Sequence, residues 1–188
     1  MRENNLNVQM FSSCNCNCSF CDFTDKCASK VDSKLVLDYI DEHPNIQYIL
    51  LTGGEPTFNM DAYVDIVKHI DTKEKMIVLQ TNGWWGNNVK IKQILREYPP
   101  TLIQVSVDSQ KQKWVNLDTI KNAISFLKEC SIRYVIINHT NSYEEYSYYL
   151  DIFPEVREGK IVDINKVKAN FGVAILANNQ IGRLTEKG

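Results

Sequence analysis

The chain has 188 residues, a formal net charge of −2, 44% hydrophobic residues and 23% charged residues. These values are ordinary for a soluble globular protein and predict a single domain over residues 1–188. The small net charge gives no reason to expect nucleic acid or an anionic membrane as a partner. No apolar run is long enough to span a membrane, and residues 1–7 lack the features of a secretory signal. We therefore expect a cytoplasmic protein with no nucleic-acid partner and no membrane partner.

Short β-like runs alternate with amphipathic helical patterns along most of the chain. We expect strands over residues 8–11, 48–51, 76–79, 102–107 and 133–138. Helices are expected over residues 34–43, after Asn59, and over residues 89–98, 117–130 and 143–153, with Ser33 and Asn59 as N-caps. A sixth strand is expected between residues 161 and 176, and a hairpin at about 171–184, turning at Asn178-Asn179. Strands separated by helices predict parallel βαβ units with right-handed crossovers.

Unusual polar segments follow the first four expected strands. They are a cysteine-rich loop from Cys14 to Cys21, Gly53-Gly54-Glu55-Pro56, Thr81-Asn82-Gly83, and Ser106-Val107-Asp108-Ser109. Parallel α/β proteins place their chemistry at the carboxyl ends of the strands. The four segments therefore predict one site at that edge of the sheet.

Four of the six cysteines, Cys14, Cys16, Cys18 and Cys21, fall within one short loop, which favours metal binding over a disulfide framework. Cys14, Cys18 and Cys21 have the spacing C-x3-C-x2-C, which suits three irons of a cubane cluster and leaves the fourth iron open. Cys16 is a further candidate ligand, although its close spacing makes simultaneous ligation awkward. The rival is a zinc site, but zinc usually draws ligands from separate places. The histidines are scattered and are interpreted as structural: His43, His69 and His139.

The chain resembles the radical SAM superfamily. The resemblance rests on Cys14, Cys18 and Cys21, with Phe20 just before the last cysteine, and on Gly53-Gly54-Glu55-Pro56 after the second strand. The segments that begin at Thr81 and Ser106 look like the ends of the family's third and fourth strands. The resemblance implies an α/β fold: a partial, laterally open parallel (β/α)5-6 barrel of the radical SAM type.

The resemblance also implies the cofactors, a [4Fe–4S] cluster on Cys14, Cys18 and Cys21 and S-adenosyl-L-methionine (SAM). The open iron would bind the amino and carboxylate groups of SAM, and an electron from the cluster would release a 5′-deoxyadenosyl radical that abstracts hydrogen from a substrate. The electron donor would be a protein such as flavodoxin or ferredoxin. No catalytic residue is assigned beyond the cluster ligands.

Several residues become candidates for SAM binding by this resemblance. The turn of Gly53, Gly54, Glu55 and Pro56 suits the amino group, because glycines permit close approach and Glu55 supplies a carboxylate. Phe20 is a candidate for packing on the adenine, with core filling as the alternative. Ser106 and Asp108 are two residues apart and would share one side of a strand. The remaining candidates, which are either turn formers or cofactor neighbours, are Thr81 and Asn82.

The substrate is less well defined than the cofactors. A peptide or other natural-product precursor is ranked first, and 7-carboxy-7-deazaguanine synthase and a glycyl-radical enzyme activase are the alternatives. The match to the synthase is weakened by Phe23, inserted in Cys21-Asp22-Phe23-Thr24. A small molecule, a peptide or a protein is therefore the expected substrate. Trp84-Trp85 is interpreted as a substrate-side wall, with capping of the core as the alternative. Lys111 is interpreted as a solvated lysine, with contact to an anionic group as the alternative. The hypothesis from another class is a non-enzymatic zinc or iron–sulfur regulatory protein.

Overall fold

A computed structural model describes residues 4–19, 21, 28–70, 74–139, 142–159, 173–175 and 178–183. Within this part of the chain, the strands form one sheet in the order β6-β5-β4-β3-β2-β1-β7-β8. Their bounds are β1 (Asn5–Phe11), β2 (Tyr48–Gly53), β3 (Met76–Thr81), β4 (Leu102–Val107), β5 (Tyr134–His139), β6 (Arg157–Gly159), β7 (Val173–Ile175) and β8 (Ile181–Arg183).

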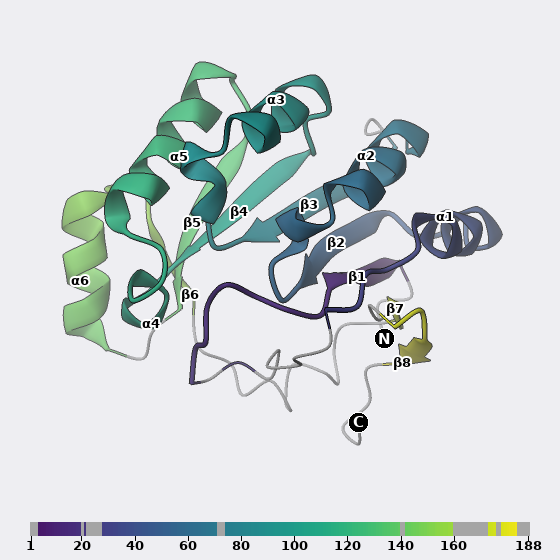
Figure 1. Ribbon diagram of the computed structural model, residues 1–188, viewed down its shortest axis with the longest axis horizontal. Coiled ribbons are helices and arrows are strands. Elements are labelled where there is room, and N and C mark those ends of the chain that lie inside the picture. Colours follow the sequence, from purple (N-terminus) through teal and green to yellow (C-terminus); the bar gives the residue numbers. More distant parts are fainter. Residues whose placement is uncertain are drawn as a thin grey trace.

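The pairing of neighbouring strands is parallel from β6 to β7, and only β8 pairs in the antiparallel sense, with β7. The longer helices are α1 (Ser33–Glu42), α2 (Met60–His69), α3 (Val89–Glu97), α5 (Leu117–Glu129) and α6 (Tyr143–Ile152). They lie along one side of the curved sheet (Figure 1). Short helical segments follow β2, β3 and β4: η1 (Pro56–Phe58), η2 (Trp84–Asn87) and α4 (Ser109–Gln112). The α/β architecture with an open parallel sheet, predicted from the sequence, is confirmed.

Side chains along each strand point alternately to the side of the sheet that faces the helices and to the inner side. Ile49 and Leu51 of β2 are fully buried, and their register partners on β3 are the buried Ile77 and Leu79. Because side chains on a strand alternate between the two faces, residues between these positions point to the inner side. The helix-facing side is the main hydrophobic core, and burial of such side chains stabilises the fold by about 1.5–3 kcal/mol each.

Two helix starts differ in detail from the sequence prediction, one in the identity of the N-cap and the other in the role of its side chain. The N-cap of α1 is Asp32 rather than Ser33, because the Asp32 carboxylate accepts a hydrogen bond from the Lys34 backbone N–H at 3.0 Å. Asn59 precedes α2 as expected, yet its side chain makes no capping bond. Its amide instead donates to the Met10 carbonyl at 3.1 Å. Asn59 therefore ties the start of α2 to β1.

The sixth strand in chain order, β6, lies at Arg157–Gly159, before the expected window of residues 161–176. The strand inside that window is β7, which pairs with β1 at the other side of the sheet. Its antiparallel partner β8 follows a turn in which Asn179 has a φ of 63°. Composition alone carries no information about which sheet edge a short strand joins.

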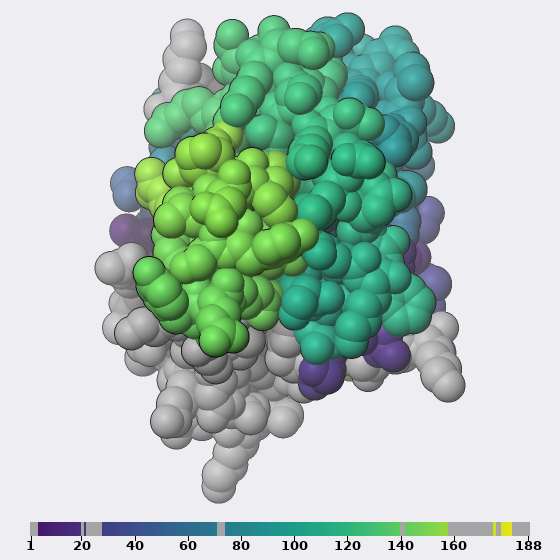
Figure 2. Space-filling model, turned by 90° about the vertical axis from the view of Figure 1, so that its left-hand side faces the viewer, coloured from purple at the N-terminus to yellow at the C-terminus, as the bar shows by residue number. Residues whose placement is uncertain are grey.

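Helix α6 and the chain around α4 and α5 cover the face of the molecule at the β5–β6 end of the sheet (Figure 2). Tyr149 of α6 is buried there, whereas Tyr143 and Tyr148 are exposed. Helix α6 therefore packs against the rest of the protein through Tyr149 and leaves Tyr143 and Tyr148 exposed to solvent. None of the helices in the described ranges combines the length and apolar character that crossing a membrane requires.

A substitution at Gly86 tests how closely η2 packs against α5. An added Cβ at Gly86 would lie 1.9 Å from the Thr119 carbonyl oxygen and 2.8 Å from the Ala123 backbone nitrogen. Because both neighbours are backbone atoms of a helix, Gly86→Ala should lower the free energy of unfolding by about 1–3 kcal/mol or more. Urea denaturation monitored by circular dichroism measures this change. Lys90→Ala on the exposed face of α3 should stay within about 0.5 kcal/mol, and equal stabilities for the two variants would contradict the packing described.

Candidate functional site

The cysteine-rich loop after β1 and the Gly-Gly-Glu-Pro turn after β2 are joined through their backbones. The Gly54 N–H donates to the Phe11 carbonyl at 2.8 Å, and the Glu55 N–H donates to the Ser13 carbonyl at 2.9 Å. An added Cβ at Gly54 would lie 2.1 Å from the same Ser13 oxygen. Gly53 has a φ of 121°, a conformation that side chains rarely adopt. In the structure, therefore, the two glycines allow the turn to pack against the start of the cysteine loop.

Glu55 is 1% exposed, and its carboxylate accepts hydrogen bonds from its own turn and from the end of β3. One oxygen, Oε1, accepts from Thr57 Oγ1 at 2.7 Å and from Thr81 Oγ1 at 2.8 Å. The other, Oε2, accepts from the Asn82 backbone N–H at 2.9 Å. Burial raises the pKa of Glu55, and these hydrogen bonds oppose the rise. Glu55 thus fastens the end of β3 to the turn after β2.

Pro56 is buried at the first position of η1, where its fixed φ suits the start of a helical turn. Thr81 Oγ1, besides donating to Glu55, accepts hydrogen bonds from the Gly83 N–H at 3.1 Å and from Trp85 Nε1 at 3.2 Å. Thr81 is therefore part of a hydrogen-bonded unit around the Glu55 carboxylate, and Pro56 follows Glu55 directly in the same turn.

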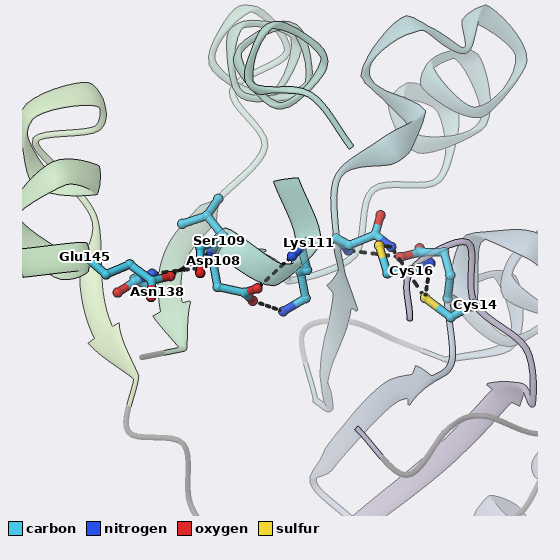
Figure 3. Close-up of polar contacts among 10 residues, drawn as sticks. Cys14, Cys16, Asp108, Ser109, Lys111, Asn138 and Glu145 are labelled. Atoms are coloured by element: carbon cyan, nitrogen blue, oxygen red, sulfur yellow. Dashed lines mark hydrogen bonds and ion pairs between the residues drawn. The ribbon is translucent and has the colours of Figure 1, made fainter. Parts of the chain in front are cut away.

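Asn82 connects this unit to the cysteines. Its side-chain oxygen accepts from the Trp84 N–H at 3.0 Å. Its amide nitrogen donates to Asn15 Oδ1 at 2.8 Å, to Cys16 Sγ at 3.3 Å and to Cys14 Sγ at 3.6 Å. The dashed lines that meet at Cys14 and Cys16 in Figure 3 include these contacts. Asn82 is thus the contact between the end of β3 and the thiols.

Three of the thiols influence one another electrostatically. Hydrogen bonding from Cys16 lowers the pKa of Cys14 and of Cys18, and the same two contacts raise the pKa of Cys16. Cys21 is partly exposed, and its N–H donates to the Cys18 carbonyl at 3.1 Å. The three thiols are therefore close enough to shift one another's protonation, and the thiolate is the form that binds metal.

The donor set on this loop is compatible with a [4Fe–4S] cluster. Within the described residues, no group of three His, Cys, Asp or Glu side chains has the arrangement that would hold one metal ion. A cubane cluster distributes three thiolates over three irons, so the ligands need not converge on one point. Cys14, Cys18 and Cys21 lie on one loop at the carboxyl end of β1, and the side-chain amide of Asn82 contacts Cys14. Phe20 and Cys27 lie outside the described residues.

The end of β4 differs from the sequence expectation. Ser106 and Asp108 are both buried, but β4 ends at Val107 and Asp108 becomes the N-cap of α4. Its carboxylate accepts from the Lys111 backbone N–H at 2.8 Å and pairs with Lys111 Nζ at 2.6 Å (Figure 3). The Lys111 side chain is 13% exposed, so the interpretation as a solvated lysine was wrong. Asp108 therefore positions Lys111, whose charge contributes to the lowered pKa of Cys18.

The two tryptophans also differ from each other. Trp85 is fully buried in the core and meets Phe126 edge to face, with ring centroids 6.1 Å apart. Trp84 is half-buried, donates from Nε1 to Thr57 Oγ1 at 2.8 Å and packs on Phe58. Trp85 is consequently a core residue rather than part of a substrate-side wall.

Sequence reasoning missed a polar row on the inner side of the sheet. Gln9 pairs in register with Thr52, and Gln80 with Gln104. Thr52 Oγ1 donates to Gln80 Oε1 at 2.9 Å, which joins the two pairs. All four side chains are partly exposed, whereas a complete barrel fills such positions with branched apolar residues. Gln9 and Gln104, which lie within expected strands, were the available signal.

His139 at the end of β5 was also missed, since it was interpreted as structural. It follows the alternation of β5 to the inner side, two residues beyond Ile137, the register partner of Ser106. Burial, with a contribution from Lys111, lowers the pKa of His139 to about 4. A neutral imidazole therefore stands near the Asp108–Lys111 pair.

Comparison with known proteins identifies the family. The model of the Radical SAM superfamily matches residues 8–146. The chain is 24% identical over 133 residues to a putative peptide biosynthesis protein, YydG, of Bacillus subtilis, covering 66% of this chain and 42% of that protein. It is 27% identical over 177 residues to a 7-carboxy-7-deazaguanine synthase of Clostridium acetobutylicum, covering 83% of this chain and 76% of that protein. The chain thus spans less than half of the Bacillus relative.

Solved structures share the fold at low identity. Native anSMEcpe with bound AdoMet and Cp18Cys peptide has a TM-score of 0.61 and 18% identity, over 89% of this chain and 54% of that chain. TYW1 with a lysine-pyruvate adduct bound has a TM-score of 0.54 and 12% identity, over 80% of this chain and 63% of that chain. At these identities the likeness shows the fold alone.

The first prediction from this geometry concerns Thr81. Thr81→Val keeps the shape of the side chain but removes the acceptor of Trp85 Nε1 and of the Gly83 N–H, and it removes one of the donors to Glu55 Oε1. Because these groups are buried, the free energy of unfolding should fall by about 1–3 kcal/mol in urea denaturation. Thr52→Val is the matched control, because water can replace the bond of its half-exposed hydroxyl to Gln80. A loss as large in the control would contradict a special role for the Glu55 network.

The second prediction concerns pH. The pKa of His139 is lowered to about 4 from 6.5, so between these values the unfolded chain binds a proton that the folded chain does not. The free energy of unfolding should therefore fall as the pH is lowered from 7 to 4, by about 3 kcal/mol from this group at most. His139→Gln should remove that part of the loss, measured as the difference between urea midpoints at the two pH values. The same loss in variant and wild type would show that His139 titrates alike in both states.

Proposed function

Because this chain belongs to the radical SAM superfamily, we propose that it binds a [4Fe–4S] cluster through Cys14, Cys18 and Cys21 and cleaves SAM. When bound, the cluster supplies the electron that breaks the sulfur–C5′ bond, and the resulting 5′-deoxyadenosyl radical abstracts hydrogen from the substrate. The observation that carries the proposal is the meeting of the cysteine loop with the Glu55 turn and Asn82 at one edge of the sheet. We further propose that the enzyme is cytoplasmic and that a flavodoxin or ferredoxin donates the electron.

The residues of the chain would divide the binding of SAM among them. In the proposed site, the turn of Gly53, Gly54, Glu55 and Pro56 faces the amino group, with Oε2 of Glu55 as the acceptor. That oxygen accepts one hydrogen bond within the described chain and retains a further lone pair. Ser106 on the inner side is the candidate for the ribose or the carboxylate. Asp108 would contribute by holding Lys111 beside the thiols, since its carboxylate is occupied by that lysine.

A peptide or another natural-product precursor is the proposed substrate. The supporting feature is the polar row of Gln9, Thr52, Gln80 and Gln104, which carries no charge and offers amide and hydroxyl groups to a ligand on the inner side. Peptide backbones present matching donors and acceptors. The relative from Bacillus subtilis is described as a putative peptide biosynthesis protein, which agrees with this substrate class.

The second candidate is a 7-carboxy-7-deazaguanine synthase, favoured by the relative from Clostridium acetobutylicum, which aligns over 83% of this chain. A neutral heterocycle could also use the amide groups of the polar row. Expression of this chain in a strain that lacks the synthase separates the two candidates. Appearance of 7-carboxy-7-deazaguanine would replace the peptide proposal with this one.

The decisive test is anaerobic reconstitution with iron and sulfide, followed by dithionite reduction with SAM and measurement of 5′-deoxyadenosine. Wild type should form the product, whereas Cys14→Ala, Cys18→Ala and Cys21→Ala should form none, because each loses a ligand to the cluster. Cys16→Ala is the matched control on the same loop and should retain the product. Bound iron and the absorption spectrum are measured for each protein.

The proposal would be contradicted if well-folded wild type binds zinc, takes up no [4Fe–4S] cluster and makes no 5′-deoxyadenosine. That outcome would support a metal-binding regulatory protein. Loss of product in Cys16→Ala, with retention in one of the other three variants, would instead assign a different ligand set.

A further inference from the structure

Asn82 is fixed in one orientation by contacts at both of its ends. Its backbone N–H donates to Glu55 Oε2, and its side-chain oxygen accepts from the Trp84 N–H at 3.0 Å. Only the oxygen of the amide can accept a hydrogen bond, so the NH₂ group must point the other way. The side chain is 4% exposed, and water therefore has little access to it.

The NH₂ group points at the cysteine loop, where three acceptors share its two hydrogens. They are Asn15 Oδ1 at 2.8 Å, Cys16 Sγ at 3.3 Å and Cys14 Sγ at 3.6 Å. Cys14 Sγ also accepts the Cys16 backbone N–H at 3.3 Å. The Cys14 sulfur is therefore surrounded by two N–H donors, one from its own loop and one from the end of β3.

N–H donors aimed at a cysteine sulfur favour negative charge on that sulfur. When the thiolate is a ligand of an iron–sulfur cluster, the reduced state carries the greater negative charge, so such donors raise the reduction potential. The rigid attachment of Asn82 to Glu55 and Trp84 means that this donor is positioned before any ligand binds.

We propose that Asn82 is a positioning residue that raises the reduction potential of the cluster by donating to Cys14. This inference rests on the proposed function, because it takes Cys14 as a ligand. It goes beyond the sequence expectation for Asn82, which was a turn former or a neighbour of SAM. The NH₂ group of the Asn82 side chain donates to Cys14 Sγ, and its oxygen accepts the Trp84 N–H.

The test is an EPR-monitored redox titration of the reconstituted protein without SAM. Asn82→Asp keeps the acceptor for the Trp84 N–H and removes the donor to Cys14, and Asn82→Leu removes the donor without adding charge. Both variants should titrate at a more negative potential than wild type. Asn88→Asp is the matched control, because Asn88 caps α3 through its Oδ1 and contacts no cysteine. It should retain the wild-type potential.

Wild-type potentials in both Asn82 variants would overturn the proposal, as would an equal shift in Asn88→Asp. If a variant takes up no cluster, the proposal is tested instead by pulse EPR of reduced wild type labelled with ¹⁵N in the asparagine side chains. A ¹⁵N coupling to the cluster is expected, and its absence overturns the proposal. Failure of wild type itself to assemble a [4Fe–4S] cluster would instead contradict the proposed function.

Discussion

The buried carboxylate of Glu55 is the contact on which the site depends. It receives hydrogen bonds from Thr57 in its own turn and from Thr81 and Asn82 at the end of β3. The turn that carries it is bonded through its backbone to the loop after β1. Three consecutive parallel strands are thereby joined at their carboxyl ends. A buried carboxylate is costly unless its oxygens are satisfied, and here the site residues themselves satisfy it.

This arrangement explains why the strand-end residues have two partners rather than one. Asn82 is bonded to Glu55 through its backbone and to the cysteine loop through its side chain. Asp108 both begins α4 and holds the Lys111 ammonium. Hydrogen-bonded networks of this kind hold side chains in one geometry, and preorganised groups act on charge without reorganising. The side chains at the carboxyl ends of the strands are therefore held in place by hydrogen bonds within the protein itself.

Much of the fold was predictable because hydrophobic periodicity is a local property. Residues 102–107 were expected as a strand and form β4. The edge at which the motifs meet followed from the parallel connections. Contacts between distant segments were not predictable. The alternation that paired Ser106 with Asp108 failed because the strand ends at Val107, and nothing in the composition revealed that Gly54 lies against the carbonyl of Ser13.

The pairing of β1 with β7 has a consequence for how the chain acquires its structure. Leu6 is the register partner of Val173, and 173 − 6 gives a separation of 167 residues. Contacts so distant in sequence close late, because a long loop must first be ordered. During synthesis, one edge of β1 therefore stays unpaired until residues 173–175 have left the ribosome. Strand β1, which leads into the cysteine loop, is therefore among the last strands to be paired on both sides. A cluster inserted before that pairing would bind to a loop whose preceding strand is still unpaired along one edge.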